Sequence, residues 1–150
     1  MKQNTAPIII GCDHAAVGLK DIIKAYLVDT AGLDVKDVGT FSADSVDYPD
    51  YAIQVARAVS EGTYERGILI CGTGIGMSMA ANRFPHVRAA LCNDLFSAKL
   101  SRQHNNANIL VMGGRVIGDV LANEILKAWL ETPFEGGRHQ LRLDKFDQVC

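Results

Sequence analysis

Short apolar runs alternate along this chain with segments in which apolar residues recur every three or four positions. A short apolar run is typical of a buried strand, and the longer spacing is typical of a helix with one buried face. The runs that predict strands cover residues 7–12, 35–38, 68–70, 87–92 and 108–112. The segments that predict helices cover residues 19–27, 49–62, 77–82, 95–104 and 120–130.

The residues between these segments fit the predicted boundaries. Residues 39–48 are polar and loop-like, and Pro49 suits the first turn of a helix because its ring fixes φ. Thr132 and Pro133 end the last predicted helix, and a tail of residues 134–150 follows.

Strands that alternate with helices predict a parallel sheet with helices on both faces. We therefore predict an α/β fold, a Rossmann-like three-layer α/β/α sandwich with a five-stranded parallel sheet. Ligands of such folds bind beyond the carboxyl ends of the strands. We expect Asp13 and His14, the loop at Cys71 and the segment after Cys92 to share that edge.

The stretch of residues 67–76 reads G-I-L-I-C-G-T-G-I-G, and Cys71 stands where its apolar run ends. The alternating glycines after Cys71 let the backbone turn sharply and approach a ligand closely. The helix predicted next offers free N–H groups to an anion and favours the thiolate form of a neighbouring cysteine. We interpret this stretch as the reaction centre; the alternative is a glycine-rich turn with a buried, inert cysteine.

Length and charge limit the class of protein. The chain has 150 residues, enough for one domain with its own core, so we treat residues 1–150 as a single domain. Its 48% apolar and 21% charged residues are typical of a soluble globular protein. A net charge of -2 gives no reason to expect nucleic acid or a membrane surface as a partner. A membrane-spanning helix needs about 20 consecutive apolar residues, and no apolar run of this chain approaches that length. The first residues lack the apolar middle of a secretory signal.

Four cysteines, at positions 12, 71, 92 and 150, lie far apart and form no C-x-x-C pair. This spacing favours free thiols in a reducing cytoplasm over a disulfide framework or a zinc site. We interpret Cys12 and Cys92 as buried small residues and Cys150 as incidental.

The glycine turn matches neither common nucleotide-binding pattern. Its glycines lack the spacing of the dinucleotide fingerprint, and no Lys-Ser or Lys-Thr follows them as in a P-loop. Cys71, His104 and Asp13 suit either a cysteine hydrolase, with Cys71 as nucleophile, or proton transfer, with the thiolate as base. Spacing along the sequence does not separate these two chemistries.

Six separated motifs carry a resemblance to one family. They are GCDH at residues 11–14, DYP at 47–49, the stretch at 67–76, AAN at 80–82, LSRQHN at 100–105 and EGGRH at 135–139. Together they resemble the type B ribose-5-phosphate isomerases, which belong with the galactose-6-phosphate isomerase subunits. The resemblance extends from about residue 8 to about residue 142.

The resemblance implies an aldose–ketose isomerase that uses neither metal nor cofactor and acts on a phosphorylated pentose. Cys71 matches the family's base, which moves a proton between C2 and C1 of the sugar through an enediolate. Some relatives carry serine at the position of Cys71 and use a glutamate at the position of Met77 as the base. Methionine cannot take a proton, so this chain resembles the branch of the family that uses cysteine. Thr73 matches a hydroxyl that assists at the substrate oxygens. The loop residues that match the anion hole around the enediolate are Gly72, Gly74, Ile75 and Gly76.

Further residues match contacts made before and around this step. His104, with Asp13, matches the group that opens the sugar ring, and Asn105 matches a residue that contacts the sugar. Tyr48 matches a residue of the pocket. The positions that match phosphate contacts are His14, Arg115, Arg138 and Arg142, and a guanidinium fork suits phosphate geometry.

The resemblance also implies a homodimer, with pairing of dimers into a tetramer left open. In the family, His104 and part of the arginine set come from the neighbouring subunit, so we expect residues 134–150 to pack on the partner. His139 stays open between a phosphate contact and an interface residue.

Plainer interpretations remain beside these. Asp13 suits a helix N-cap, His104 suits the end of a helix, and Arg138 and Arg142 are spaced like one solvated helix face. His14 and His86 suit the surface, and Arg115 suits a loop. For the whole chain, the alternatives are an isomerase of a hexose 6-phosphate, such as allose or galactose 6-phosphate, and a non-catalytic phosphosugar-binding protein.

Overall fold

The computed structural model describes residues 5–149, which form a five-stranded parallel sheet with the strand order β2-β1-β3-β5-β4. The predicted α/β fold is confirmed. The strands are β1 (Ile8–Cys12), β2 (Val35–Asp37), β3 (Arg66–Cys71), β4 (Ala89–Leu91) and β5 (Ile109–Gly113). Every residue of β1, β3 and β5 is buried, as strands covered on both faces require.

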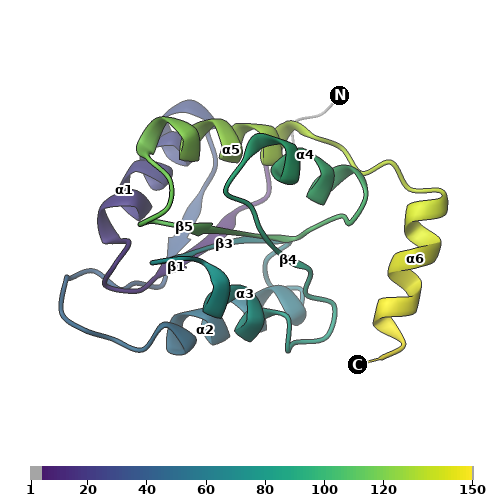
Figure 1. Ribbon diagram of the computed structural model, residues 1–150, viewed down its shortest axis with the longest axis horizontal. Coiled ribbons are helices and arrows are strands. Elements are labelled where there is room, and N and C mark those ends of the chain that lie inside the picture. Colours follow the sequence, from purple (N-terminus) through teal and green to yellow (C-terminus); the bar gives the residue numbers. More distant parts are fainter. Residues whose placement is uncertain (1–4, 150) are drawn as a thin grey trace.

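Helices cover both faces of the sheet (Figure 1). The covering helices are α1 (Val17–Ala25), α2 (Tyr48–Ser60), α3 (Ile75–Ala81), α4 (Leu95–Gln103) and α5 (Asp119–Glu131). A further helix, α6 (Arg138–Asp147), lies to the side of these layers (Figure 1). Side chains of α1, α4 and α5 share one hydrophobic core with the sheet, and those of α2 and α3 share the core on the other face. No helix within residues 5–149 combines the length and the apolar composition needed to cross a bilayer.

Some boundaries differ from the predicted ones. The first predicted helix ends in a π-helical turn, η1 (Tyr26–Thr30), and α3 begins two residues early because Gly74, at φ 80°, caps it. Strand β4 is shorter than predicted, since the N–H of Arg88 donates to the Asn108 side chain instead of to a strand. Helix α6 lies in the predicted tail, where the spacing of Arg138 and Arg142 was the indication of a helix, and it contributes no residue to either core.

Trp129 of α5 is fully buried beside two arginines. The guanidinium carbons of Arg66 and Arg102 lie 5.8 Å and 5.5 Å from the centroid of its ring. Such contacts attract a cation to the negative face of the aromatic ring. They join the start of β3 and the last turn of α4 to α5, at the edge of the sheet where β3 and β5 begin.

Lys20 of α1 is also fully buried, and its ammonium is paired. Its Nζ lies 2.8 Å from Asp37 Oδ1 and donates to the carbonyl oxygen of Thr40, while Lys24 Nζ lies 2.8 Å from Asp37 Oδ2. Burial alone would raise the pKa of Asp37, but the hydrogen bonds from Lys20 and Lys24 outweigh burial and lower it. The pairs therefore fasten the segment after β2 to α1, beside the carboxyl end of β1.

Replacing Asp37 by asparagine should lower the free energy of unfolding by about 3 kcal/mol, because Lys20 then stays buried without its counter-charge. Urea unfolding at a fixed protein concentration measures this loss. The exposed Asp34→Asn is the matched control and should cost less than about 0.5 kcal/mol.

The same assignment gives a pH dependence. The pKa of Asp37 is lower in the folded than in the unfolded protein, where it is about 3.9. The contribution of Asp37 to the free energy of unfolding is therefore present above the unfolded-state pKa and is lost as pH falls through the folded-state pKa. The difference between Asp37→Asn and the parent should therefore shrink in acid. Equal losses for Asp37→Asn and Asp34→Asn near neutral pH would contradict the assignment.

Candidate active site

The turn from β3 into α3 holds the predicted reactive thiol. Cys71 is the last residue of β3, its exposed fraction is 5%, and its sulfur accepts a hydrogen bond from the N–H of Gly74 at 3.2 Å. Gly74 adopts φ 80°, a conformation in which a side chain is strained. A Cβ on Gly74 would also lie 2.4 Å from Leu91 Cδ1. The glycine is therefore what brings this amide to the sulfur.

The rest of the turn is held by contacts of its own. The N–H of Ile75 donates to Thr73 Oγ1 at 3.2 Å, and Thr73 itself is exposed. At Gly76, a Cβ would lie 2.4 Å from the ring of Tyr48, so the missing side chain lets that ring cover the start of α3. Two of the amides expected to hold an anion, those of Gly74 and Ile75, thus already have acceptors within the loop.

The end of β1 places Asp13 and His14 at the same edge of the sheet. Asp13 is 7% exposed, its N–H donates to the carbonyl oxygen of Ile70, and its carboxylate accepts the N–H of Ala15 at 3.0 Å. The cap of α1 is Ala16, so the alternative in which Asp13 caps that helix is wrong. His14 is half-buried, and its Nδ1 accepts the N–H of Val46 at 3.1 Å, which ties it to the predicted 39–48 loop.

The end of β5 completes this edge. The N–H of Arg115 donates to the carbonyl oxygen of Gly72 at 3.0 Å, and its side chain lies over Gly72, 3.6 Å from where a Cβ would stand. Asn93, in the segment after Cys92, accepts the N–H of Gly113 at 3.1 Å. The expected meeting of these segments at one edge is confirmed, and it joins Asp13, Cys71 and Arg115.

Within one chain, His104 lies at the edge of the sheet opposite to the edge that holds Cys71. Helix α4 begins after β4, capped by Asp94, and His104 ends it just before the chain enters β5 at Ile109. A helix that connects parallel strands runs back along the sheet, so its end lies beyond the amino ends of the strands. Asn105 follows His104, and α6 lies on this side too (Figure 1). One chain therefore does not bring Cys71 and Asp13 to His104.

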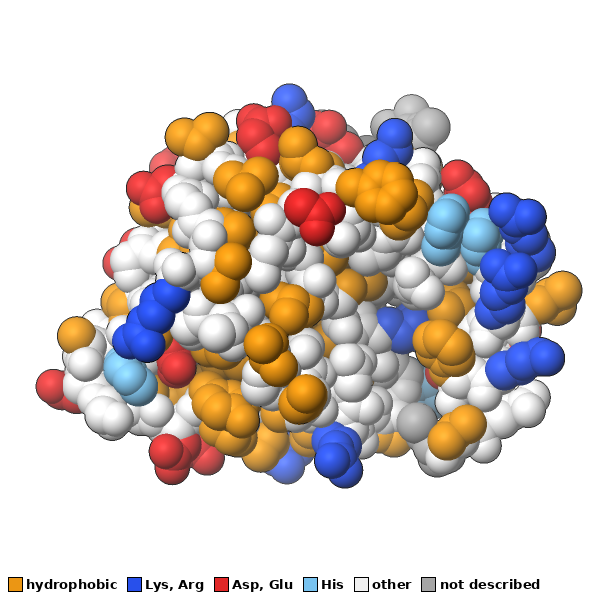
Figure 2. Space-filling view, in the orientation of Figure 1, with side chains coloured by type: hydrophobic (Ala, Val, Ile, Leu, Met, Phe, Trp, Pro, Cys, Tyr) orange, Lys and Arg blue, Asp and Glu red, His pale blue; other side chains and the backbone are white. Residues whose placement is uncertain are grey.

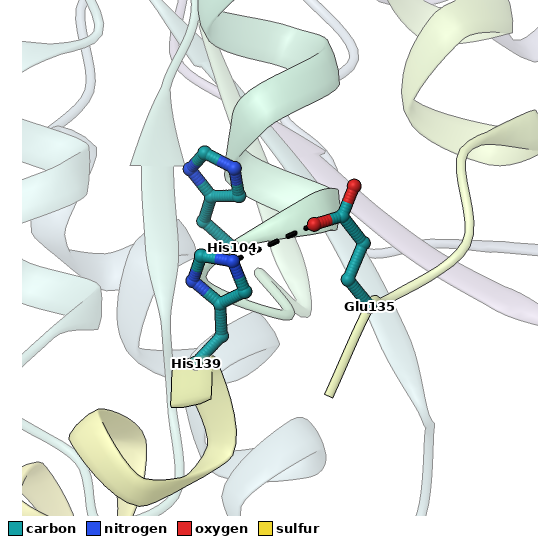
Figure 3. Close-up of side chains that lie close together, drawn as sticks. All are labelled: His104, Glu135 and His139. Atoms are coloured by element: carbon teal, nitrogen blue, oxygen red, sulfur yellow. Dashed lines mark ion pairs between the residues drawn. The ribbon is translucent and has the colours of Figure 1, made fainter. Parts of the chain in front are cut away.

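His104 belongs to a cluster that the sequence analysis did not assemble. Its ring stacks on that of His139, with centroids 4.2 Å apart and planes at 9°. His139 Nε2 lies 3.5 Å from Glu135 Oε2, as Figure 3 shows. Burial and then the positive charges of His104 and Arg138 lower the pKa of His139. Glu135 precedes α6, which begins at Arg138, so the four-residue spacing of this pair is not a helical contact and did not predict it.

A cavity of about 470 Å³ opens beside this cluster. Its lining includes His104, Asn105, His139 and Arg142. Arg138 and Arg142 are both exposed on α6, as the solvated-face interpretation expected.

The other cysteines and the remaining histidine have environments unlike that of Cys71. Burial raises the pKa of both Cys12 and Cys92 to about 11, so these thiols stay neutral, and their prediction as buried residues is confirmed. His86 is exposed, as predicted. Cys150 lies outside the described residues.

Comparisons with known proteins agree with this geometry. The family model Ribose/Galactose Isomerase matches residues 8–146. The chain is 53% identical to ribose-5-phosphate isomerase B of Escherichia coli, over 95% of each chain, and 45% identical to a D-erythrulose-4-phosphate isomerase of Pectobacterium atrosepticum, over 92% and 91%. The crystal structure of a ribose 5-phosphate isomerase from Thermotoga maritima superposes with a TM-score of 0.92 at 52% identity, covering 96% of this chain and 99% of that one.

Gly74→Ala tests whether the turn at Cys71 depends on the left-handed conformation of Gly74. The added methyl group meets a strained φ and the backbone of Met112 at 3.1 Å, so the protein should lose about 2 kcal/mol of unfolding free energy. Gly18→Ala is the matched control, because Gly18 is exposed in α1 with open space around it. It should raise stability by about 0.5 kcal/mol. Urea unfolding of both variants gives the comparison, and equal effects would contradict this role of Gly74.

Proposed function

The chain belongs to the ribose/galactose isomerase family, and from that premise we propose that it interconverts D-ribose 5-phosphate and D-ribulose 5-phosphate with Cys71 as the base. The family and its relatives make the chain an aldose–ketose isomerase. The single observation that carries the assignment of the base is the position of the Cys71 sulfur, which ends β3 at the turn into α3 and accepts the Gly74 N–H at 3.2 Å.

In the proposed reaction, the Cys71 thiolate takes the proton from C2 of the open-chain aldose, and the electrons of the C–H bond form the C1–C2 double bond of an enediolate. A proton passes from the C2 hydroxyl to O1, with Thr73 assisting at these oxygens. As the C2–O bond becomes a carbonyl, the proton held by Cys71 is delivered to C1, which gives the ketose and restores the thiolate. The negative oxygen of the intermediate needs preorganised donors, and one such donor is worth on the order of 3 kcal/mol. Loop amides from Gly72 to Gly76 supply them, with Gly74 leaving the sulfur once Cys71 carries the proton and Ile75 exchanging its Thr73 acceptor for the substrate oxygen. Neither a metal nor a cofactor is required.

We assign ring opening to His104 of the partner subunit, acting beside Asp13. The reason is the distance between the two edges of one sheet, which separates Cys71 from His104 within a chain. Helix α6 supports this arrangement, since it lies outside both cores and exposes Leu141 and Phe146. Residues 1–150 are thus proposed as one domain that works as a homodimer, with residues 134–150 on the partner.

Phosphate binding is assigned to two sets of cations. His14 and Arg115 lie at the edge that holds Cys71, and Arg138 and Arg142 of the partner subunit would approach from α6. Arginine suits this task because its planar fork can donate two parallel hydrogen bonds to phosphate oxygens. Tyr48 and Asn105 are proposed to line the space around the sugar.

A second candidate substrate keeps the mechanism and changes the sugar. The 45% identical relative named as a D-erythrulose-4-phosphate isomerase favours a sugar with fewer carbon atoms. The family name Ribose/Galactose Isomerase allows a hexose 6-phosphate. Comparing kcat/KM for tetrose, pentose and hexose phosphates decides among them. A clear preference for a sugar other than the pentose would replace the proposed substrate.

Cys71→Ala should lower kcat for ribose 5-phosphate by about 10²–10⁴-fold, because the base of the proton transfer is lost. Sugar-phosphate binding should largely persist, since phosphate contacts are untouched. Cys92→Ala is the matched control for a buried thiol and should keep the parent activity. Full activity of Cys71→Ala would overturn the assignment of the base. A protein that only binds sugar phosphates would show no turnover as the parent, as Cys71→Ala or as Cys92→Ala.

Mixing two inactive variants tests the shared site. Cys71→Ala and His104→Ala homodimers should each be inactive, but subunit exchange creates heterodimers in which one site has both residues. At equal amounts, activity should recover to about a quarter of the parent value, as expected for random pairing in a two-fold dimer. Recovery should be absent when either variant is mixed with itself. No recovery after exchange, verified by native mass spectrometry, would mean that the two residues do not meet across subunits.

A further inference from the structure

The cluster of His104, Glu135 and His139 offers three metal-ligating side chains in one place. One ligand atom of each lies within 4.8 Å of the other two. The side chain of His139 is 7% exposed, whereas that of Glu135 is 50% exposed and can move. Figure 3 shows the carboxylate of Glu135 turned toward the two stacked rings.

This ligand set suits a borderline transition metal. Two imidazoles and one carboxylate are a known zinc set that leaves a fourth position open. With metal–ligand distances of about 2.0–2.1 Å, ligand atoms of a tetrahedral zinc lie roughly 3.4 Å apart. The 3.5 Å between His139 Nε2 and Glu135 Oε2 already fits that spacing. The stacked rings must turn for both nitrogens to face one ion, and the terminal torsion of histidine is soft enough to allow it.

The ligand types in this cluster disfavour a hard cation. His104 and His139 each offer an imidazole nitrogen, a ligand type that suits transition metals and not Mg²⁺ or Ca²⁺. The Lys and Arg side chains of α6, Arg138, Arg142 and Lys145, gather over this end of the molecule (Figure 2). Among the described residues of one chain, the cluster holds a single carboxylate beside two imidazoles, whereas Mg²⁺ and Ca²⁺ prefer several oxygen ligands. The neighbouring cavity of about 470 Å³ gives an ion a way in.

We propose that His104, Glu135 and His139 form a binding site for Zn²⁺ or a similar transition-metal ion, and that its occupation stops isomerisation by engaging His104. The binding site stands on the geometry alone, whereas the inhibition rests on the role of His104 in the proposed function. Zinc would thus act as a reversible inhibitor and not as a cofactor.

Calorimetric titration with ZnCl₂ tests the site, in a Cys71→Ala background that removes the candidate catalytic thiol. One zinc should bind per chain. Adding His139→Ala should abolish this binding. Adding Glu135→Gln should weaken zinc affinity by at least about 10-fold, because losing even a residue that only supports a metal ligand typically costs about 10-fold or more. Adding His86→Asn, which removes an exposed histidine outside the cluster, should leave it unchanged, and MgCl₂ should not bind. Absent zinc binding, or binding undiminished by both cluster variants in a protein of unchanged circular dichroism, overturns the proposal.

Activity measurements test the inhibition with Cys71 in place. Isomerisation by the parent should fall in step with zinc occupancy and return on addition of a chelator. Glu135→Gln should keep the parent activity without zinc and need at least about 10-fold more zinc for the same loss. Equal zinc sensitivity of the two would place inhibition elsewhere and overturn that half. An enzyme that turns over no sugar phosphate, yet binds zinc through His139, would refute the proposed function and leave the metal site standing.

Discussion

The direction of the crossover helices governs how this chain distributes its chemistry. Every strand of the sheet runs the same way, so each helix must return the chain to the edge where the strands begin. Residues that follow strands, such as Asp13, Cys71 and Arg115, collect at one edge, and residues that follow helices, such as His104, collect at the other. No local change of sequence can alter this separation without changing the topology.

The three described cysteines differ in what their sulfur atoms contact. Burial raises the pKa of Cys12 and of Cys92 to about 11. Cys71 is nearly as buried, but it faces an amide that the left-handed turn at Gly74 directs at its sulfur. The contrast arises from backbone geometry after the strand, and exposure alone would not reveal it.

Much of this arrangement could be predicted from the sequence, and the exceptions have physical reasons. The central strands β1, β3 and β5 could be predicted because burial on both faces requires unbroken apolar runs. Helix α6 gives a weaker sequence signal, since a helix outside the core needs no apolar stripe and its N-cap, Gly137, carries no capping side chain. The cluster of His104 and His139 was missed because it joins the ends of two helices, a proximity that only the path of residues 132–137 creates. The carboxyl-edge residues were found because strand ends in a parallel sheet meet by rule.

The burial of Trp129 beside two guanidinium groups gives the molecule a built-in optical reporter. It is the single tryptophan of the chain, and it lies at the edge where strands begin, away from Cys71. Its fluorescence emission therefore reports on the packing of α5 against the sheet and is insensitive to events at the distant thiol. Measured beside catalysis, that signal distinguishes a protein that has lost its fold from one that has lost only its chemistry.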